Sequence, residues 1–181
     1  MKDSVILKEG KVLIYPTDTI WGIGCSALDT PAIEKVKTIK GRDNNKSLIL
    51  LVKDIEMLCN YVEYVPKCAI DMINNTTEPT TIIYPKAKNL PIQHLSFNES
   101  IAIRIPKNDY LQQLFMEIDF PIVSTSANFS GSPSPKCFAD IDKELLQKVD
   151  YVSTYHRENT ANNTSSVIYL VENNNTLTKI R

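Results

Sequence analysis

The apolar run Leu48-Ile49-Leu50-Leu51-Val52 decides the fold class, because a strand without alternating polar residues is typical of a sheet covered on both faces. Outward from this run, short β-rich segments alternate with segments of helical periodicity. Strands are expected at 12–15, 48–52, 80–84, 101–105, 121–123, 151–152 and 167–170, and helices at 31–40, 54–61, 66–74, 109–117 and 140–148. This alternation predicts an α/β sandwich around a largely buried sheet.

The length and composition indicate one compact domain spanning 1–181. The chain has 181 residues, of which 43% are hydrophobic, and this suits a single core. With 20 basic and 21 acidic residues the net charge is −1, so any contact with nucleic acid must be local. No apolar run approaches the ~18 residues of a membrane span, and the first residues lack the core of a signal peptide. We therefore expect a cytoplasmic protein without a membrane partner.

The cysteines and histidines argue against two common kinds of site. The four cysteines form no C-x-x-C pair and lie far apart: Cys25, Cys59, Cys68 and Cys137. We interpret them as small apolar residues, and we predict no zinc or redox site. His94 and His156 have no metal-like companion at helical spacing. A Ser-His-Asp hydrolase is not supported, and no residue is predicted to ligate a metal.

Basic side chains gather where the helix over 31–40 ends and the chain approaches the buried strand. They are Lys35, Lys37, Lys40, Arg42 and Lys46. A solvated helix face explains such a run. A polyphosphate site explains it as well, because ligands of α/β proteins collect at the ends of strands, where arginine and lysine can hold phosphate oxygens.

Two further features carry polar chemistry. Arg104 lies in the apolar strand over 101–105, and a guanidinium there must form an ion pair or reach the edge of a site, where it could bind a carboxylate. The segment 124–131 is dense in hydroxyls and amides directly after a strand, which suits phosphate, ribose or an amino acid, and equally an ordinary turn. The sequence contains neither of the glycine-rich phosphate motifs G-x-x-x-x-G-K-[ST] and G-x-G-x-x-G.

Taken together, four segments resemble the YrdC family, and they occur in that family's order. They are Tyr15-Pro16-Thr17-Asp18-Thr19-Ile20-Trp21-Gly22-Ile23-Gly24, Lys40-Gly41-Arg42 with Lys46, Ile101-Ala102-Ile103-Arg104-Ile105-Pro106, and Ser124-Thr125-Ser126-Ala127-Asn128-Phe129-Ser130-Gly131. The stretches 78–81 and 164–168 resemble two further family segments, and the length resembles the short bacterial form. The resemblance implies a twisted mixed β-sheet flanked by helices, with a concave face that holds the substrates.

The same resemblance implies an L-threonylcarbamoyladenylate synthase, which is a nucleotidyltransferase. Such an enzyme forms threonylcarbamoyl-AMP and pyrophosphate from L-threonine, bicarbonate and ATP, for N6-threonylcarbamoyladenosine modification at tRNA position 37. Its implied partners are these substrates, tRNA and the other threonylcarbamoylation proteins. Mg²⁺ is expected to accompany ATP, held largely by phosphate and water.

The resemblance also implies roles for individual residues. Lys40 and Arg42 would be catalytic. The ATP-binding residues would be Lys40, Arg42, Lys46, Ser100, Ser126, Asn128, Ser134 and Arg181. The threonine-binding residues would be Thr17, Thr19, Arg104, Ser124 and Ser165.

Three departures from the family pattern leave other interpretations open. Asp43 follows Arg42 where proline is common, Glu78-Pro79 replaces a Pro-Gly-Pro, and Thr164-Ser165-Ser166 replaces a segment like Pro-Ser-Thr. One alternative is a catalytically inactive module of the same fold that binds RNA or a nucleotide. Another is a sibling that transfers a carbamoyl group to a different acceptor.

Overall fold

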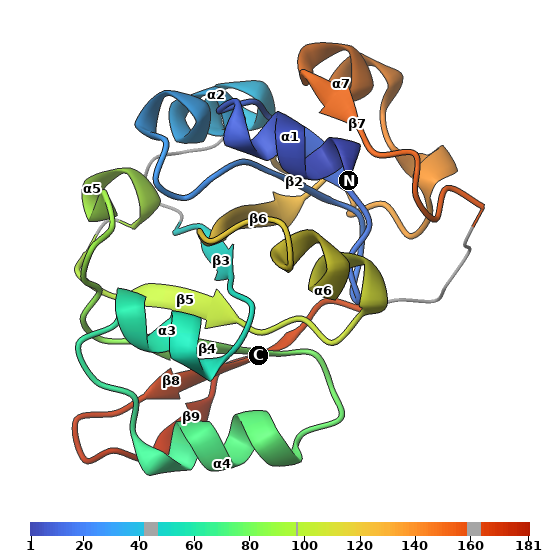
Figure 1. Ribbon diagram of the computed structural model, residues 1–181. Coiled ribbons are helices and arrows are strands. Elements are labelled where there is room, and N and C mark those ends of the chain that lie inside the picture. The colour runs from blue at the N-terminus through green and yellow to red at the C-terminus, as the bar shows by residue number, and fades with distance from the viewer. Residues whose placement is uncertain (42–46, 97, 159–163) are drawn as a thin grey trace.

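The computed structural model describes residues 1–41, 47–96, 98–158 and 164–181. Within these residues nine strands form one mixed sheet in the order β7-β1-β2-β6-β3-β5-β4-β8-β9 (Figure 1). The strands are β1 (Leu13–Tyr15), β2 (Gly22–Gly24), β3 (Ile49–Leu51), β4 (Thr80–Tyr84), β5 (Ile101–Arg104), β6 (Ile122–Ser126), β7 (Tyr151–Val152), β8 (Val167–Val171) and β9 (Leu177–Lys179). The pairs β1–β7, β3–β5 and β4–β8 are parallel and the others antiparallel. The predicted fold class is confirmed.

Seven α-helices and one 3₁₀ turn accompany the sheet in the described part of the chain. They are α1 (Lys2–Lys8), α2 (Thr30–Lys40), α3 (Ile55–Tyr61), α4 (Lys67–Asn75), α5 (Ile92–Leu95), α6 (Asp109–Phe115), η1 (Phe138–Asp140) and α7 (Lys143–Lys148). Local chemistry sets the ends of α2: Asp29 Oδ1 accepts from Ala32 N at 2.9 Å, and Gly41 ends the helix at φ 57°. No described helix is long and apolar enough to span a membrane.

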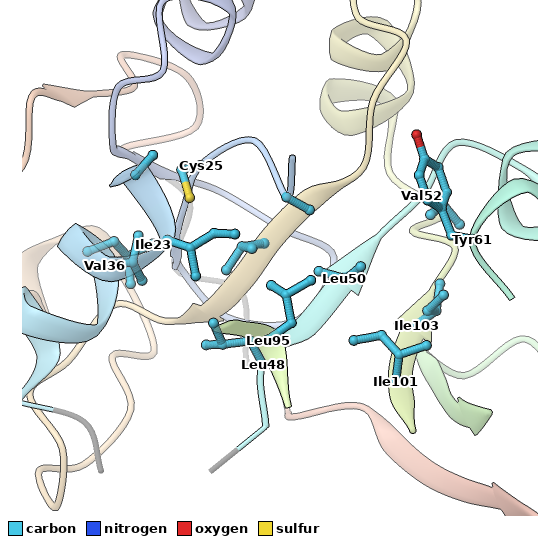
Figure 2. Close-up of a cluster of buried hydrophobic side chains, with 14 of the residues drawn as sticks. Ile23, Cys25, Val36, Leu48, Leu50, Val52, Tyr61, Leu95, Ile101 and Ile103 are labelled. Carbon is cyan, nitrogen blue, oxygen red and sulfur yellow. The ribbon is translucent and has the colours of Figure 1, made fainter. Parts of the chain in front are cut away.

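Alternation along the strands divides the core into two clusters. One face of the sheet contributes Ile14, Ile23, Leu50, Ile103 and Val123 to a large cluster that also contains the apolar side of α2 (Figure 2). On the other face, Leu13, Tyr15, Leu51 and Ile122 pack with residues of α1 and α6 into a second cluster. Side chains alternate between the two faces of a strand. The residues next to Leu50, Ile103 and Val123 therefore point to the second face, including the part that α1 and α6 leave uncovered.

The structure corrects several predicted boundaries in the second half of the chain. β6 continues to Ser126, so the first three residues of the expected polar loop belong to a strand. The helix predicted at 140–148 begins only at Lys143. Asp140 belongs to η1, where its carboxylate accepts from Lys136 N and Cys137 N, and Asp142 caps the start of α7. The expected strand at 101–105 ends at Arg104.

Three elements form where no element was predicted, and one predicted loop is a strand. α1, α5 and β9 are the additions, and all are short. β2 replaces part of the loop expected after β1. Its residue Gly24 is needed there, because a Cβ at this position would lie 1.7 Å from the carbonyl oxygen of Val123.

Candidate functional site

A polar cavity of about 370 Å³ lies on the sheet face that carries the second core cluster. Strand register builds its floor: Ile49 is paired with both Ser124 and Ala102, and Arg104 is paired with Thr81. These side chains are one position removed from residues of the large core cluster, so the strands that make the core also present the cavity. Residues lining the cavity include Thr17, Thr19, Trp21, Gly22, Ser47, Ile83, Ala102, Arg104, Ser124, Ser126, Ser134, Ser165, Ser166, Ile168 and Arg181.

Arg104 provides a buried positive charge in the cavity. It is the last residue of β5, and its side chain is 5% exposed. Its Nη1 donates to Asp18 Oδ1, which makes an ion pair with a side chain that is 13% exposed. The sequence left open whether Arg104 forms an ion pair or reaches the edge of a site. The structure shows that it does both. A guanidinium has five N–H donors, so this pair leaves donors for a ligand.

The turn after β1 brings two threonine hydroxyls to the cavity, and the direction of their hydrogen bonds is fixed. Thr17 Oγ1 donates to the carbonyl oxygen of Ile20 at 2.7 Å, and it accepts from Thr19 N at 3.0 Å. Because its one proton is used, the 2.8 Å contact between the two hydroxyls has Thr19 as the donor. Thr19, which is 5% exposed, then offers lone pairs to the cavity. This wall is suited to a ligand that donates, such as an amine.

Small residues of β2 leave room beside these hydroxyls. A Cβ on Gly22 would lie 3.3 Å from both Ser124 Oγ and Thr17 Cγ2, so a side chain here would crowd the cavity wall. Beneath the wall, the hydroxyl of Tyr15 donates to the carbonyl oxygen of Val123 at 3.2 Å. Burial raises the pKa of Tyr15 far above its usual range, so this phenol remains a neutral donor.

The opposite wall of the cavity is formed by β4, β8 and the end of the chain. The hydroxyls of Thr81 and Ser166 are 2.7 Å apart and buried. Arg181 donates from Nε and Nη2 to the carbonyl oxygen of Ser166, at 3.3 and 3.1 Å. These contacts bring a second guanidinium to the cavity, on the side that also holds Ser165.

Lys40 takes a different position from the one the basic cluster suggested. It is 3% exposed, and its ammonium donates to the carbonyl oxygens of Ser126 and Asn128, the latter at 2.7 Å. Lys40 therefore braces the chain at the end of β6 from behind the cavity wall. Two other lysines of α2 pair with carboxylates: Lys35 with Asp150 and Lys37 with Glu34.

The structure thus gathers most of the predicted site residues in one cavity. Those that line it are Thr17, Thr19, Arg104, Ser124, Ser126, Ser134, Ser165 and Arg181. Asn128 lines a neighbouring cavity and donates to the carbonyl oxygens of Phe129 and Ser132. Ser100 does not line this cavity, and it donates to Asn98 Oδ1 at 2.5 Å. Arg42 and Lys46 lie outside the described residues.

Sequence reasoning missed four polar residues of this region. Ser47, Thr125 and Ser166 line the cavity, and Asp18 pairs with Arg104. The signal for Ser166 was its place on the same strand face as Ile168. For Asp18 the signal was a carboxylate between two threonines, in the segment 15–24 that resembles the YrdC family.

The described residues offer little to a metal ion. No group of three or more His, Cys, Asp or Glu side chains close enough to hold one is found in 1–41, 47–96, 98–158 or 164–181. Asp18 Oδ1 is occupied by Arg104, and Asp18 Oδ2 accepts from Lys107 N at 3.3 Å. The described polar side chains that line the cavity carry hydroxyl and guanidinium groups, and none of them is a carboxylate, an imidazole or a thiol.

Comparisons with known proteins agree on one family. The family model for Sua5, YciO and YrdC, described as "Telomere recombination", matches residues 5–181. A putative threonylcarbamoyl-AMP synthase of Methanocaldococcus jannaschii is 40% identical over 144 residues, covering 79% of this chain and 67% of the relative. A threonylcarbamoyl-AMP synthase of Pseudoalteromonas translucida is 30% identical over 148 residues, covering 80% and 79%.

Solved structures show the same fold. P. abyssi Sua5 complexed with L-threonine matches with a TM-score of 0.83 and 25% identity, covering 93% of this chain and 49% of Sua5. The chain therefore spans about half the length of that protein. E. coli YciO matches with a TM-score of 0.81 and 24% identity, covering 99% of this chain and 86% of YciO.

Proposed function

The chain belongs to the Sua5, YciO and YrdC family, and on this premise we propose that it is an L-threonylcarbamoyladenylate synthase. The reaction joins L-threonine, bicarbonate and ATP into threonylcarbamoyl-AMP and releases pyrophosphate and water. Relatives that carry the name threonylcarbamoyl-AMP synthase support the proposal, as does the fold shared with a Sua5 that is complexed with L-threonine.

L-threonine is proposed to bind at the Arg104 end of the cavity. The free N–H groups of the guanidinium suit its carboxylate, because a planar fork holds two oxygens at once. The lone pairs of Thr19 suit its amine, and Thr17 fixes the direction of that hydroxyl. Ser124 and Ser165, which also line the cavity, are proposed as further contacts to threonine.

The nucleotide is proposed to bind toward Ser126, Ser134 and Arg181. Arg181 supplies a guanidinium and the serines supply neutral donors for phosphate or ribose oxygens. Arg42 and Lys46 complete this proposal as phosphate ligands, with Ser100 and Asn128 as further nucleotide contacts. Lys40 is proposed to act on the nucleotide site through the backbone carbonyls of Ser126 and Asn128 that it holds. Because the described cavity offers no carboxylate cluster, Mg²⁺ would be held by phosphate oxygens and water.

The chemistry proposed needs no side-chain nucleophile. The amine of threonine attacks the carbon of bicarbonate-derived carbon dioxide and loses a proton, which gives a carbamate. A carbamate oxygen then attacks the α-phosphorus of ATP, and the bond to the pyrophosphate oxygen breaks. The protein contributes alignment of the two substrates and neutralisation of phosphate charge, for which fixed donors are effective. We assign Lys40 and Arg42 to this step.

The product is proposed to serve N6-threonylcarbamoyladenosine formation at position 37 of tRNA in the cytoplasm. A carbamoyl-adenylate is a mixed anhydride, and it must be passed to an acceptor amine before water consumes it. We therefore propose the other threonylcarbamoylation proteins as partners, together with tRNA.

One observation carries this proposal: Arg104, buried and held by Asp18, faces a cavity walled by hydroxyls in a chain of this family. The test is mass-spectrometric detection of threonylcarbamoyl-AMP after mixing the protein with ATP, L-threonine and bicarbonate. Pyrophosphate release is expected only when threonine and bicarbonate are both present. Release with neither, or with other amino acids at the same rate, would contradict the proposal, and no adenylate at all would favour an inactive binding module.

A further inference from the structure

Asp18 occupies an unusual place relative to the cavity. Its two sequence neighbours, Thr17 and Thr19, line the cavity, whereas Asp18 does not line it and instead lines two other hollows, one of which shares both threonines. It therefore meets the guanidinium of Arg104 from outside the cavity. An ion pair of this kind neutralises the buried arginine without filling the space in front of it.

Both carboxylate oxygens of Asp18 are committed to the protein. Oδ1 accepts from Arg104 Nη1, and Oδ2 accepts from the backbone N–H of Lys107 at 3.3 Å. Lys107 is itself fixed, because its ammonium donates to the carbonyl oxygens of Ile73 and Thr76 at the end of α4. The carboxylate thus has two anchors, and a ligand in the cavity does not compete for it.

From this geometry we propose that Asp18 is a positioning residue that holds Arg104 in the orientation required to grip the carboxylate of the amino-acid substrate. The inference rests on the proposed function and deepens it. A buried arginine without this partner would rotate toward any carbonyl oxygen within reach, and its remaining N–H groups would no longer converge on the cavity. Asp18 acts through Arg104, and it does not touch the substrate.

The proposal predicts how two matched substitutions differ. Asp18→Asn keeps the size of the side chain but removes the charge, and its amide group would place a donor toward either Arg104 or the N–H of Lys107. We expect it to weaken L-threonine binding by about tenfold or more, the effect of losing one charge-assisted hydrogen bond. Asp109→Asn is the control, since Asp109 lines one of the same adjoining hollows but is exposed on α6. It should change threonine binding less than about twofold.

The experiment combines calorimetry with initial rates of pyrophosphate release. The KM for L-threonine should rise in Asp18→Asn while the KM for ATP stays within about twofold, a selectivity that partial unfolding does not produce. In the Arg104→Met background, Asp18→Asn should add little to the KM for threonine. Asp18→Glu keeps the charge but displaces the carboxylate by one methylene, so it should also raise this KM, and it replaces Asp18→Asn if that variant does not fold.

The outcomes separate the inference from the function on which it rests. If the unsubstituted protein binds threonine and Asp18→Asn binds it equally well, the positioning role is wrong and the proposed function stands. Additive effects of the Asp18 and Arg104 substitutions would also overturn the positioning role. If the unsubstituted protein binds no threonine in calorimetry, the proposed function fails and the inference fails with it.

Discussion

Replacing Lys40 with methionine tests how the wall at the end of β6 is held. The ammonium donates to two backbone carbonyl oxygens in a place that is 3% exposed. The carbonyl of Ser126 keeps a second donor, Asn128 N at 2.9 Å, whereas the carbonyl of Asn128 loses the ammonium that satisfies it. Hydrogen bonds to a charged group contribute about 1.5–3 kcal/mol each, and the variant also escapes the cost of burying an ammonium. We therefore expect Lys40→Met to lose about 2–4 kcal/mol of unfolding free energy.

The assay is urea unfolding followed by fluorescence of Trp21, which is the only tryptophan of the chain and is 5% exposed. Lys37→Met is the matched control on the same helix, because its ammonium pairs with the partly exposed Glu34, and such pairs contribute only about 0–1 kcal/mol. Turnover of Lys40→Met should fall by roughly 10²-fold, because a wall displaced by about 1 Å misaligns the substrates. If Lys40→Met is as stable as Lys37→Met, the bracing role assigned to this ammonium is refuted.

Three other expectations concern the fold, the site and a surface pair. Gly24→Ala should cost about 3 kcal/mol or more in urea unfolding, because its Cβ would meet the carbonyl of Val123 at 1.7 Å; a loss below about 1 kcal/mol would contradict this packing. Arg104→Met should raise the KM for L-threonine by roughly 10²-fold in the pyrophosphate assay, and an unchanged KM would remove Arg104 from the subsite. The hydrogen bond from His94 is the largest cause that lowers the pKa of Glu34, so His94→Ala should raise that pKa in an NMR titration, and an unmoved pKa would show that the pair is not formed in solution.

Sequence reasoning succeeds where local chemistry fixes the element. The strand over 80–84 has the bounds predicted, because proline stands on either side of it. The expected helix over 31–40 ends at Gly41 as predicted, since this glycine adopts the left-handed backbone that closes a helix. Hydrophobic periodicity and breakers therefore suffice for most of the sheet and for α2.

Tertiary contacts decide what the sequence does not reveal. β2 contains two glycines in three residues, which lowers strand propensity, and yet the close approach of Val123 requires Gly24. The polar residues of β6 suggest a loop until the sheet register shows that Ser124 and Ser126 point into a cavity. The basic neighbours of Lys40 predict a site residue, but the carbonyl oxygens that accept from its ammonium belong to a segment more than 80 residues away.

The strand alternation has a consequence for how the site works. Ser124 follows Val123, and Arg104 follows Ile103, so these two polar groups of the cavity are each anchored by a neighbouring side chain in the close-packed core. Such groups have little freedom to reorganise when a ligand enters, which is the condition under which fixed donors stabilise developing charge most effectively. A reaction that depends on aligning two substrates gains from this rigidity more than from an activated nucleophile. Because Arg104 and Ser124 are adjacent to core residues, a substitution in the core beneath β5 or β6 that is too mild to unfold the protein would still displace these groups.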